Sequence, residues 1–187
     1  MDLKGRTAVV TGSTSGIGHA IASALAGAGA GVMINGIESQ AEGDAVAREL
    51  ADANGVDARY SGADMSRPEE VTGLIDETLA TFGSVDIVVN NAGIQHTAPV
   101  EAFPVEKWDA IQSIMLGSAF HTIRRAIPHM QRAGWGRIIN TASAHGLVAS
   151  VNKAAYVSAK HGLVGLTKTV TDLHDASETP ARYDIGL

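Results

Sequence analysis

A tyrosine, a lysine and a serine are spaced in this sequence so that they could perform acid–base chemistry together. Tyr156 and Lys160 lie four residues apart in the segment SAHGLVASVNKAAYVSAK, which begins at Ser143. Residues at this spacing share one face of a helix. A free tyrosine is a poor base at neutral pH because its pKa is about 10, but a neighbouring ammonium group favours the phenolate. The pair is therefore a candidate general base, although Tyr-x-x-x-Lys alone is also a common accident of helical sequences.

A glycine-rich segment near the N-terminus has the features of a nucleotide-binding loop. Gly12, Gly16 and Gly18 occur in TGSTSGIG, between a strand-like run that ends at Thr11 and a helix-like segment. Glycines allow a tight turn and a close approach of a ligand to the backbone. The free N–H groups and the positive dipole end of a helix N-terminus suit a pyrophosphate. An ordinary turn would also be rich in glycine, but the strand before it and the helix after it favour nucleotide binding.

Strand-like and helix-like segments alternate along the chain and would position these residues. Strands are predicted at 6–11, 31–35, 57–62, 85–90 and 136–143. Helices are predicted at 16–30, 38–53, 67–83, 105–132 and 153–174. Parallel neighbours need crossover connections, so the alternation predicts an α/β, Rossmann-like doubly wound parallel sheet with helices on both faces. We expect five strands in the order 3-2-1-4-5, with ligands bound beyond their carboxyl ends.

Composition and charge exclude several classes of function. The chain has 187 residues, enough for one domain with a buried core. Its formal net charge is -6 and it has no run of Lys or Arg, so no nucleic-acid partner is expected. It has no cysteine, and its seven histidines lack the paired spacing of metal sites, so no metal is expected. No apolar run is long enough for a membrane span and no signal peptide is recognisable, so we expect a cytoplasmic protein without a membrane partner.

Three separated motifs together resemble the short-chain dehydrogenase/reductase family. They are the glycine-rich loop, the segment NNAG at Asn90–Gly93, and Tyr156-x-x-x-Lys160. The resemblance implies that Tyr156 removes the proton of a substrate hydroxyl while hydride passes to a nicotinamide cofactor. Ser143 would hydrogen-bond the same oxygen, and Lys160 would assist Tyr156 and hold the cofactor ribose. The other cofactor-binding residues that the resemblance implies are Gly12, Ser13, Thr14, Ser15, Gly16, Ile17, Gly18, Asp64, Asn91, Ala92 and Gly93.

The cofactor is predicted to be NAD. The 2′-phosphate of NADP needs Arg or Lys near the end of the second strand. Here that region reads NGIESQ, with no basic residue at Asn35, Gly36 or Ile37. Asp64, after the third predicted strand, matches the family's aspartate that contacts the adenine. An aspartate in a turn or a helix cap would look the same in the sequence.

Several segments are similar to members of this family that oxidise short 3-hydroxy acids to keto acids. They include NNAGIQHTAPVEAFP and GLTKTV. In those members the residues that match Gln95, His145 and Lys153 hold the substrate carboxylate, while Ser143 and Tyr156 contact the hydroxyl. Charge-assisted donors suit a carboxylate. Each of the three could also be an exposed loop side chain.

One residue of the expected machinery differs from the family pattern. The family has an asparagine at the position of Met115 in WDAIQSIML. In the family that asparagine positions a water that links the lysine to solvent. A thioether is at best a weak acceptor, so a loss of rate is expected. Gln112, one helical turn earlier, could substitute in part.

The C-terminal segment also departs from the family pattern. After GLTKTV the family continues into a further strand and a Pro-Gly loop, whereas this chain reads TDLHDASETPARYDIGL. We expect a C-terminally truncated dinucleotide-binding domain over 1–171 and an untethered, disordered tail over 172–187, which would leave the fifth strand at an exposed sheet edge. The open hypotheses are an NAD-dependent dehydrogenase, an impaired nucleotide-binding remnant, and an interaction module that pairs with a full-length relative. The family's usual assembly favours a homo-oligomer through the predicted long helices.

Overall fold

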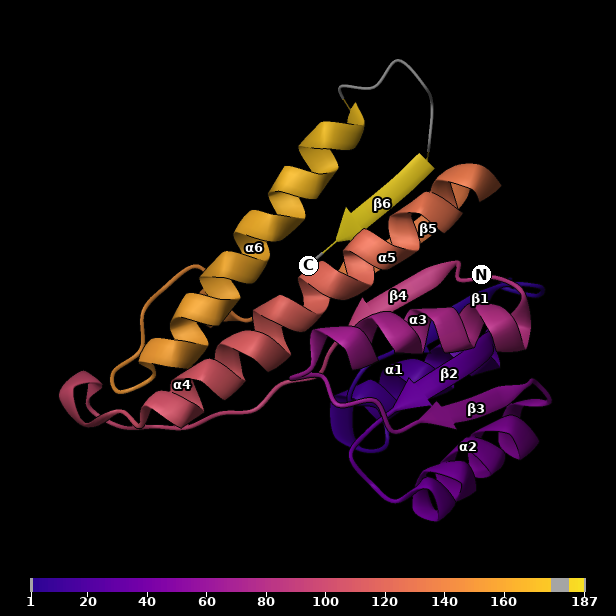
Figure 1. Cartoon of the computed structure of the whole chain (residues 1–187). Helices are drawn as coiled ribbons and strands as arrows, with labels where there is room; N and C mark the ends of the chain where they lie inside the picture. Colours follow the sequence, from indigo (N-terminus) through magenta and orange to yellow (C-terminus); the bar gives the residue numbers. More distant parts are fainter. Residues whose placement is uncertain (1, 176–181, 187) are drawn as a thin grey trace.

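A parallel β-sheet forms the centre of the fold. The computed structural model describes residues 2–175 and 182–186. The sheet has six strands in the order β3-β2-β1-β4-β5-β6, and all neighbours are parallel (Figure 1). The strands are β1 (Thr7–Val10), β2 (Gly31–Asn35), β3 (Ala58–Ser61), β4 (Ile87–Asn90), β5 (Trp135–Asn140) and β6 (Arg182–Gly186). The predicted α/β class and the order of the first five strands are confirmed.

Helices cover both faces of this sheet. The α-helices are α1 (Gly16–Gly27), α2 (Gln40–Asn54), α3 (Pro68–Phe82), α4 (Val105–Gln112), α5 (Ser118–Ala133) and α6 (Ala154–Asp175), and the short 3-10 turns are η1 (Val100–Ala102) and η3 (Ala144–Gly146). One face packs against α1 and α2, for example at Ala22, and the other against α3 and α5, for example at Leu74. Val9 and Val10 of β1 are both fully buried, one in each of these cores. Burial on both faces explains why the strand sequences are continuously apolar.

The C-terminal end differs from the sequence prediction. The expected boundary after Thr171 falls within α6, and residues 182–186 form β6, which pairs in parallel with β5. β5 is therefore not the edge of the sheet, and the prediction of a tail without a strand is wrong for these residues. The segment RYDIG carries little strand signal because polar residues interrupt it, yet backbone hydrogen bonds to an open strand edge need no apolar pattern. Residues 176–181 and 187 of the predicted tail lie outside the described residues.

The predicted long helix at 105–132 is interrupted in the structure. α4 ends at Gln112, and a π-helical turn, η2 (Ser113–Gly117), joins it to α5. Figure 1 shows α4 and α5 following one another along nearly the same line. π turns are rare and occur frequently at functional sites. Met115, the residue that departs from the family pattern, lies within this turn and is buried.

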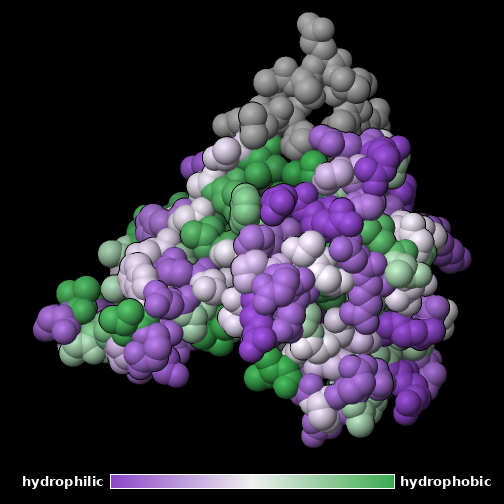
Figure 2. Space-filling view, viewed as in Figure 1, coloured by the Kyte–Doolittle hydropathy of each residue, from purple (hydrophilic) through white to green (hydrophobic). Residues whose placement is uncertain are grey.

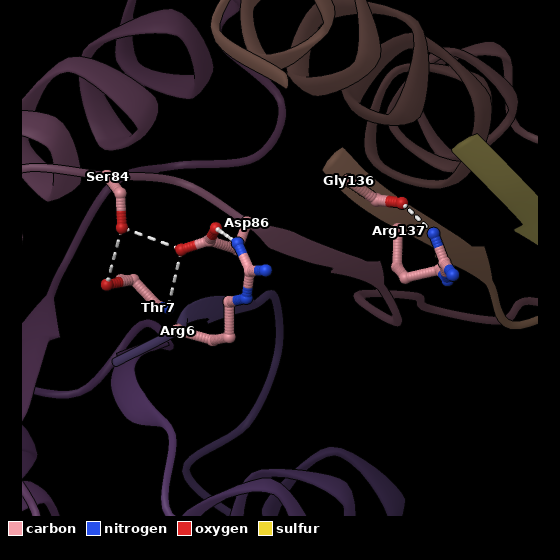
Figure 3. A network of polar contacts seen from close by, with 6 residues as sticks. All are labelled: Arg6, Thr7, Ser84, Asp86, Gly136 and Arg137. Carbon is pink, nitrogen blue, oxygen red and sulfur yellow. Dashed lines mark hydrogen bonds and ion pairs between the residues drawn. The ribbon is translucent and has the colours of Figure 1, made fainter. Parts of the chain in front are cut away.

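A polar network joins the starts of β1 and β4, at the opposite end of the sheet from the glycine loop (Figure 3). The Asp86 carboxylate accepts hydrogen bonds from the Arg6 guanidinium at 2.8 Å, from the Thr7 main-chain N–H at 2.9 Å and from the Ser84 hydroxyl at 2.6 Å. The Arg6 guanidinium also lies 4.0 Å from the centre of the Trp135 ring. Because both carboxylate oxygens have donors, the buried charge of Asp86 is satisfied and holds the two strands in register.

Apolar side chains are exposed near the start of α4. Val100 and Val105 are 74% and 70% exposed, and Trp108 is partly exposed beside them. Figure 2 shows hydrophobic surface at this end of the molecule, on the left of the view. This surface lies at one end of the helical region 105–132, through which a homo-oligomer is predicted from the sequence. That assembly stays a prediction. Among the helices of the described residues, none has the length and apolar character needed to cross a membrane.

Candidate cofactor and catalytic site

A cavity opens at the carboxyl ends of β1, β2 and β4. Its volume is about 460 Å³. Of the predicted cofactor-binding residues, those that line it are Gly12, Thr14, Ser15, Ile17, Gly18, Asn91, Ala92 and Gly93. In parallel α/β sheets this edge is where nucleotides bind. The glycine-rich loop and the NNAG segment, which lie far apart in the sequence, therefore form one site.

The glycine loop packs closely against the NNAG segment. A Cβ atom at Gly18 would lie 2.1 Å from the Gly12 carbonyl oxygen, and one at Gly12 would lie 2.9 Å from Ala92 Cα. Gly12 also has a φ of 59°, in the left-handed region that favours glycine. The Asn91 side-chain amide donates hydrogen bonds to the carbonyls of Thr11 and Gly12 at 3.1 and 2.9 Å. Any side chain at these two glycines would displace the backbone that forms the floor of the cavity.

The first turn of α1 presents hydrogen-bond donors to the same cavity. Ser15 is the N-cap residue, and its side chain makes no capping hydrogen bond. The helix begins at Gly16, followed by the cavity residues Ile17 and Gly18. First-turn N–H groups have no partner within a helix and, with the helix dipole, attract anions. The residues present therefore fit the pyrophosphate of a dinucleotide.

Two predicted cofactor residues have structural roles instead of lining the cavity. The Ser13 hydroxyl is buried and bonds to the main chain of β1 at 2.6 Å and of β2 at 3.0 Å. The Asp64 carboxylate accepts hydrogen bonds from the Ser66 N–H and hydroxyl at 2.8 and 2.7 Å, and these bonds lower the pKa of Asp64. Asp64 thus forms a turn, as one reading of the sequence expected, while its neighbours Ala63 and Met65 line the cavity. Contact of Asp64 with an adenine stays a prediction.

Glu38 lines the cavity and was missed by the sequence analysis. The Thr14 hydroxyl donates a hydrogen bond to Glu38 Oε1 at 2.9 Å. The other carboxylate oxygen, Oε2, is buried and has no hydrogen-bond partner among the described residues. Glu38 follows β2 within the segment NGIESQ, three residues after the last residue of the strand. An acidic residue at this place was the available signal.

The structure brings the predicted catalytic residues together at the carboxyl end of β5 and the start of α6. The Lys160 ammonium nitrogen lies 5.8 Å from the centre of the Tyr156 ring on the same helix. The Ser143 hydroxyl oxygen accepts a hydrogen bond from the His145 main-chain N–H at 3.2 Å, where the chain leaves β5. The His145 ring meets the Tyr156 ring edge-on, with centres 6.1 Å apart. One serine, one histidine, one tyrosine and one lysine thus form a single cluster.

Lys160 is buried and held by the main chain. Only 4% of the residue is exposed, and its ammonium group donates a hydrogen bond to the Thr141 carbonyl. Desolvation by burial lowers the pKa of Lys160. The Thr141 N–H in turn donates to the Asn90 carbonyl at 2.9 Å. The lysine of α6 is therefore fixed relative to the ends of β4 and β5.

A buried polar network positions those strand ends. The Asn90 amide donates to the Asn140 side-chain oxygen at 2.8 Å, and the Thr122 hydroxyl donates to the Asn90 side-chain oxygen at 2.7 Å. The Asn140 amide donates to the Thr167 hydroxyl at 2.9 Å. These residues come from β4, β5, α5 and α6. Because the members satisfy one another, the network is expected to rigidify the segments that lead to the predicted catalytic residues.

Met115 lies beside Tyr156, the predicted catalytic base. It belongs to an apolar cluster between α4 and α6 that includes Tyr156. Its terminal carbon lies 3.4 Å from the position that a Cβ atom would take at Gly93, so it also borders the NNAG segment. The side-chain amide of Gln112 donates to the Ala155 carbonyl at 2.9 Å. This hydrogen bond joins α4 to α6 and leaves the second N–H and the oxygen of the amide available, so a partial substitution of Gln112 for the missing asparagine stays a prediction.

The three predicted carboxylate-binding residues lie on neighbouring loops. Gln95 is exposed in the segment after β4, and Lys153 is half-buried just before α6. The Ala98 N–H donates to the Asn152 carbonyl at 3.0 Å, so these two loops run side by side. Nδ1 of His145 is buried and has no hydrogen-bond partner among the described residues. A common role of Gln95, His145 and Lys153 in holding a substrate stays a prediction.

The sequence is similar to known dehydrogenases over most of its length. The profile of the family described as short chain dehydrogenase matches residues 6–178. The D-beta-hydroxybutyrate dehydrogenase of Cupriavidus necator is 55% identical over 175 residues, which cover 93% of this chain and 66% of that protein. The protein of the same name from Rhizobium meliloti is 54% identical over 165 residues, which cover 88% of this chain and 64% of that protein. The chain thus spans about two thirds of the length of these curated relatives.

The structure is also similar to a solved oxidoreductase. A metagenomic short-chain oxidoreductase in complex with NADP superposes with a TM-score of 0.90 at 32% sequence identity. The match covers 98% of this chain and 80% of that one. NADP belongs to that neighbour, so the likeness supports a nicotinamide dinucleotide site without choosing between the two cofactors.

Proposed function

Because this chain belongs to the short chain dehydrogenase family, we propose that it is an NAD-dependent oxidoreductase for a short 3-hydroxy acid, converting 3-hydroxybutyrate to acetoacetate. The observation that carries the proposal is the cluster of Ser143, Tyr156 and Lys160 at the same sheet edge as the glycine-lined cavity. The names of the two curated relatives support the substrate. Bound NAD would supply the hydride acceptor, while the chain supplies binding, orientation and proton transfer.

Tyr156 is proposed to accept the proton of the substrate hydroxyl. The Lys160 ammonium group lies 5.8 Å from the ring centre and is proposed to assist this proton transfer. Ser143 keeps its O–H free to donate to the substrate oxygen, because its bond with the His145 N–H uses only an acceptor position. Positioned acid–base groups of this kind contribute about 10²–10⁴-fold to rate.

NAD is proposed as the cofactor because of the charges around the cavity. Among the described residues that line it, none is Lys or Arg, and Glu38 carries a carboxylate. A 2′-phosphate would therefore lack a charge-assisted donor there. The first-turn N–H groups of α1 would hold the pyrophosphate. Gly12 and Gly18 line the same cavity, and neither position has space for a side chain.

The substrate carboxylate is proposed to bind between the loops before α6 and after β4. Lys153 supplies a positive charge near the start of α6, and its loop runs beside the loop of Gln95. The buried, unpartnered Nδ1 of His145 offers a further polar atom next to Tyr156. A short hydroxy acid suits such a site because its charge needs directed donors and its few carbons need little apolar surface. We further propose a homo-oligomer assembled through α4, α5 and α6.

A nucleotide-binding protein with impaired turnover is the second candidate. Met115 favours it, because a buried thioether beside Tyr156 cannot replace an amide that holds a water. The third hypothesis, an interaction module that binds through the edge of β5, has less support because β6 pairs with that edge.

The decisive experiment measures cofactor binding and turnover separately. NADH binding is followed by fluorescence, and NADH formation from D-3-hydroxybutyrate and NAD is followed by absorbance. Tyr156→Phe is expected to reduce turnover by about 10²-fold or more without weakening NADH binding. Ser158→Ala, at an exposed position on the same helix, is the matched control. Turnover that survives Tyr156→Phe would refute the catalytic assignment, and a folded chain that binds no NADH would refute the cofactor site.

A further inference from the structure

Asn152 holds a backbone conformation that most residue types avoid. Its φ is 61°, and it is the only non-glycine residue with a positive φ among those that the structure describes. This left-handed region is costly for L-amino acids, and only glycine and, less often, asparagine and aspartate visit it routinely. Asn152 is exposed, so burial of its side chain does not impose the conformation. The reason for it therefore lies in the path of the backbone.

The conformation of Asn152 closes a tight turn directly before α6. The Lys153 N–H donates a hydrogen bond to the Ser150 carbonyl at 3.4 Å, so Asn152 is the second central residue of a four-residue turn. A positive φ at this position alone is the pattern of a type II turn, which favours glycine or asparagine there. The Lys153 carbonyl then accepts a hydrogen bond from the Val157 N–H at 2.9 Å. The turn therefore leads straight into the first turn of α6.

The same turn is fastened to the loop that follows β4. The Asn152 carbonyl accepts a hydrogen bond from the Ala98 N–H at 3.0 Å, and we call this contact the loop latch. It lies near the end of the molecule where α4 and α6 begin (Figure 1). The two segments meet again where Phe103 and Ala154 line one hollow of about 250 Å³. A change of φ at Asn152 reorients the adjoining peptide groups, so the loop latch depends on the left-handed conformation.

The loop latch connects two residues that are proposed to bind the substrate carboxylate. Gln95 lies three residues before Ala98, and Lys153 directly follows Asn152. Tyr156 lies a further three residues along the chain, in the first turn of α6. The described lining of the cofactor cavity includes neither Ala98 nor Asn152. The latch is therefore placed to affect the binding of a substrate and not the binding of a dinucleotide.

We propose that Asn152 is a positioning residue, whose left-handed backbone keeps the loop latch closed and so holds the loops of Gln95 and Lys153 in the arrangement that binds the hydroxy acid. The inference rests on the proposed function, because it concerns the affinity for the proposed substrate. When only a fraction of the chains has the competent arrangement, the apparent affinity falls in proportion to that fraction. A residue that disfavours a positive φ at position 152 should therefore weaken substrate binding.

The test compares Asn152→Val with Asn152→Gly in the full chain. Valine is β-branched and is an outlier at positive φ, whereas glycine adopts such a φ freely. The Michaelis constant for D-3-hydroxybutyrate should rise about fivefold to tenfold in Asn152→Val, with kcat and the Kd of NADH unchanged. Asn152→Gly should match the wild-type chain in all three quantities. Ala149→Val is the matched control, because it adds the same side chain at an exposed residue of this loop without a positive φ.

Amide hydrogen exchange measures the loop latch without any turnover. The Ala98 N–H is protected by its hydrogen bond to the Asn152 carbonyl. In Asn152→Val this amide should exchange about fivefold to tenfold faster, because the latch is open for more of the time. In Asn152→Gly and Ala149→Val its exchange should equal that of the wild-type chain.

The possible outcomes separate this inference from the proposed function. An unchanged Michaelis constant in Asn152→Val overturns the positioning role, and so does an equal rise in Asn152→Gly, because the side chain and not the backbone would then matter. An accompanying loss of NADH affinity also overturns it, since the effect would then be a general disturbance of the fold.

Two further measurements keep the test decisive. If the folded wild-type chain neither oxidises D-3-hydroxybutyrate nor binds acetoacetate in the presence of NAD by calorimetry, the proposed function fails. The exchange of the Ala98 N–H then still decides whether the loop latch depends on Asn152. If Asn152→Val does not fold, Asn152→Ala takes its place, because alanine also disfavours a positive φ but is not β-branched.

Discussion

The Lys160 ammonium group donates a hydrogen bond to the main-chain carbonyl of Thr141, and this contact joins α6 to the end of β5. Thr141 lies two residues before Ser143, so the same contact relates the lysine to the serine. Tyr156 is one helical turn from Lys160, with its ring centre 5.8 Å from the ammonium nitrogen. The buried side chain of Lys160 thus relates the position of Tyr156 on α6 to that of Ser143 after β5.

The burial of Lys160 predicts a rise of stability with pH. Burial lowers its pKa in the folded chain below the ordinary value of 10.5. Between the folded and unfolded pKa the unfolded chain binds more protons, so the free energy of unfolding should increase with pH in that window. Urea unfolding at a series of pH values from neutral to about 10 measures this slope. In Lys160→Met the free energy of unfolding should increase less with pH than in the wild-type chain. In Lys168→Met, which changes an exposed position on α6, the increase should equal that of the wild-type chain. Identical slopes in all three proteins would contradict the prediction.

Gly18→Ala should abolish dinucleotide binding. The added Cβ atom would meet the Gly12 carbonyl oxygen at 2.1 Å, so the loop must move. We expect the free energy of unfolding to fall by about 1–3 kcal/mol as well. Gly73→Ala in α3 is the control, because its added Cβ would have no atom within 4 Å apart from its chain neighbours and the nearby backbone of its own helix, and it should stabilise the helix by about 0.5–1 kcal/mol. Undiminished NADH affinity in Gly18→Ala would show that the glycine loop is not the pyrophosphate site.

Met115→Asn should raise turnover of D-3-hydroxybutyrate. The amide would place a donor and an acceptor beside Tyr156, where the thioether offers neither in useful strength. An increase of at least about tenfold is expected, within the range of acid–base contributions. Met115→Leu keeps the apolar volume and should not raise turnover. Equal rates in the two variants would remove Met115 as the cause of impaired activity.

Asp86→Ala should destabilise the fold without a direct effect on the site. The change leaves the buried end of the network without its acceptor for Arg6, Thr7 and Ser84. A loss of about 2–3 kcal/mol is expected, below that of a fully buried ion pair because the Arg6 side chain is 35% exposed. Asp57→Ala, which breaks an exposed pair with Arg59, should cost less than about 1 kcal/mol. Chemical denaturation followed by circular dichroism gives the free energy of unfolding of both variants. Equal losses in Asp86→Ala and Asp57→Ala would mean that the Asp86 network stabilises the fold no more than an exposed ion pair does.

Local patterns in the sequence determined the fold class and much of the candidate site. Alternating strand and helix signals predicted the parallel sheet and the order of its first five strands, because burial on both faces forces the strands to be apolar. The spacing of Tyr156 and Lys160 predicted their shared helix face, since helical geometry alone decides it. The glycines at Gly12 and Gly18 predicted a tight turn with room for a ligand beside the backbone; the structure adds that both glycines are packed against neighbouring backbone atoms.

Only the tertiary structure decided the features that depend on contacts between distant segments. The fold-back of Glu38 onto Thr14 depends on space left at Gly36, and the hydrogen bond from Lys160 to Thr141 depends on how α6 packs against β5. The pairing of β6 depends on an available edge at β5, and the polar sequence RYDIG by itself does not predict this pairing. Such contacts are set by the three-dimensional fit of whole elements, whereas sequence patterns report only which face of each element is buried.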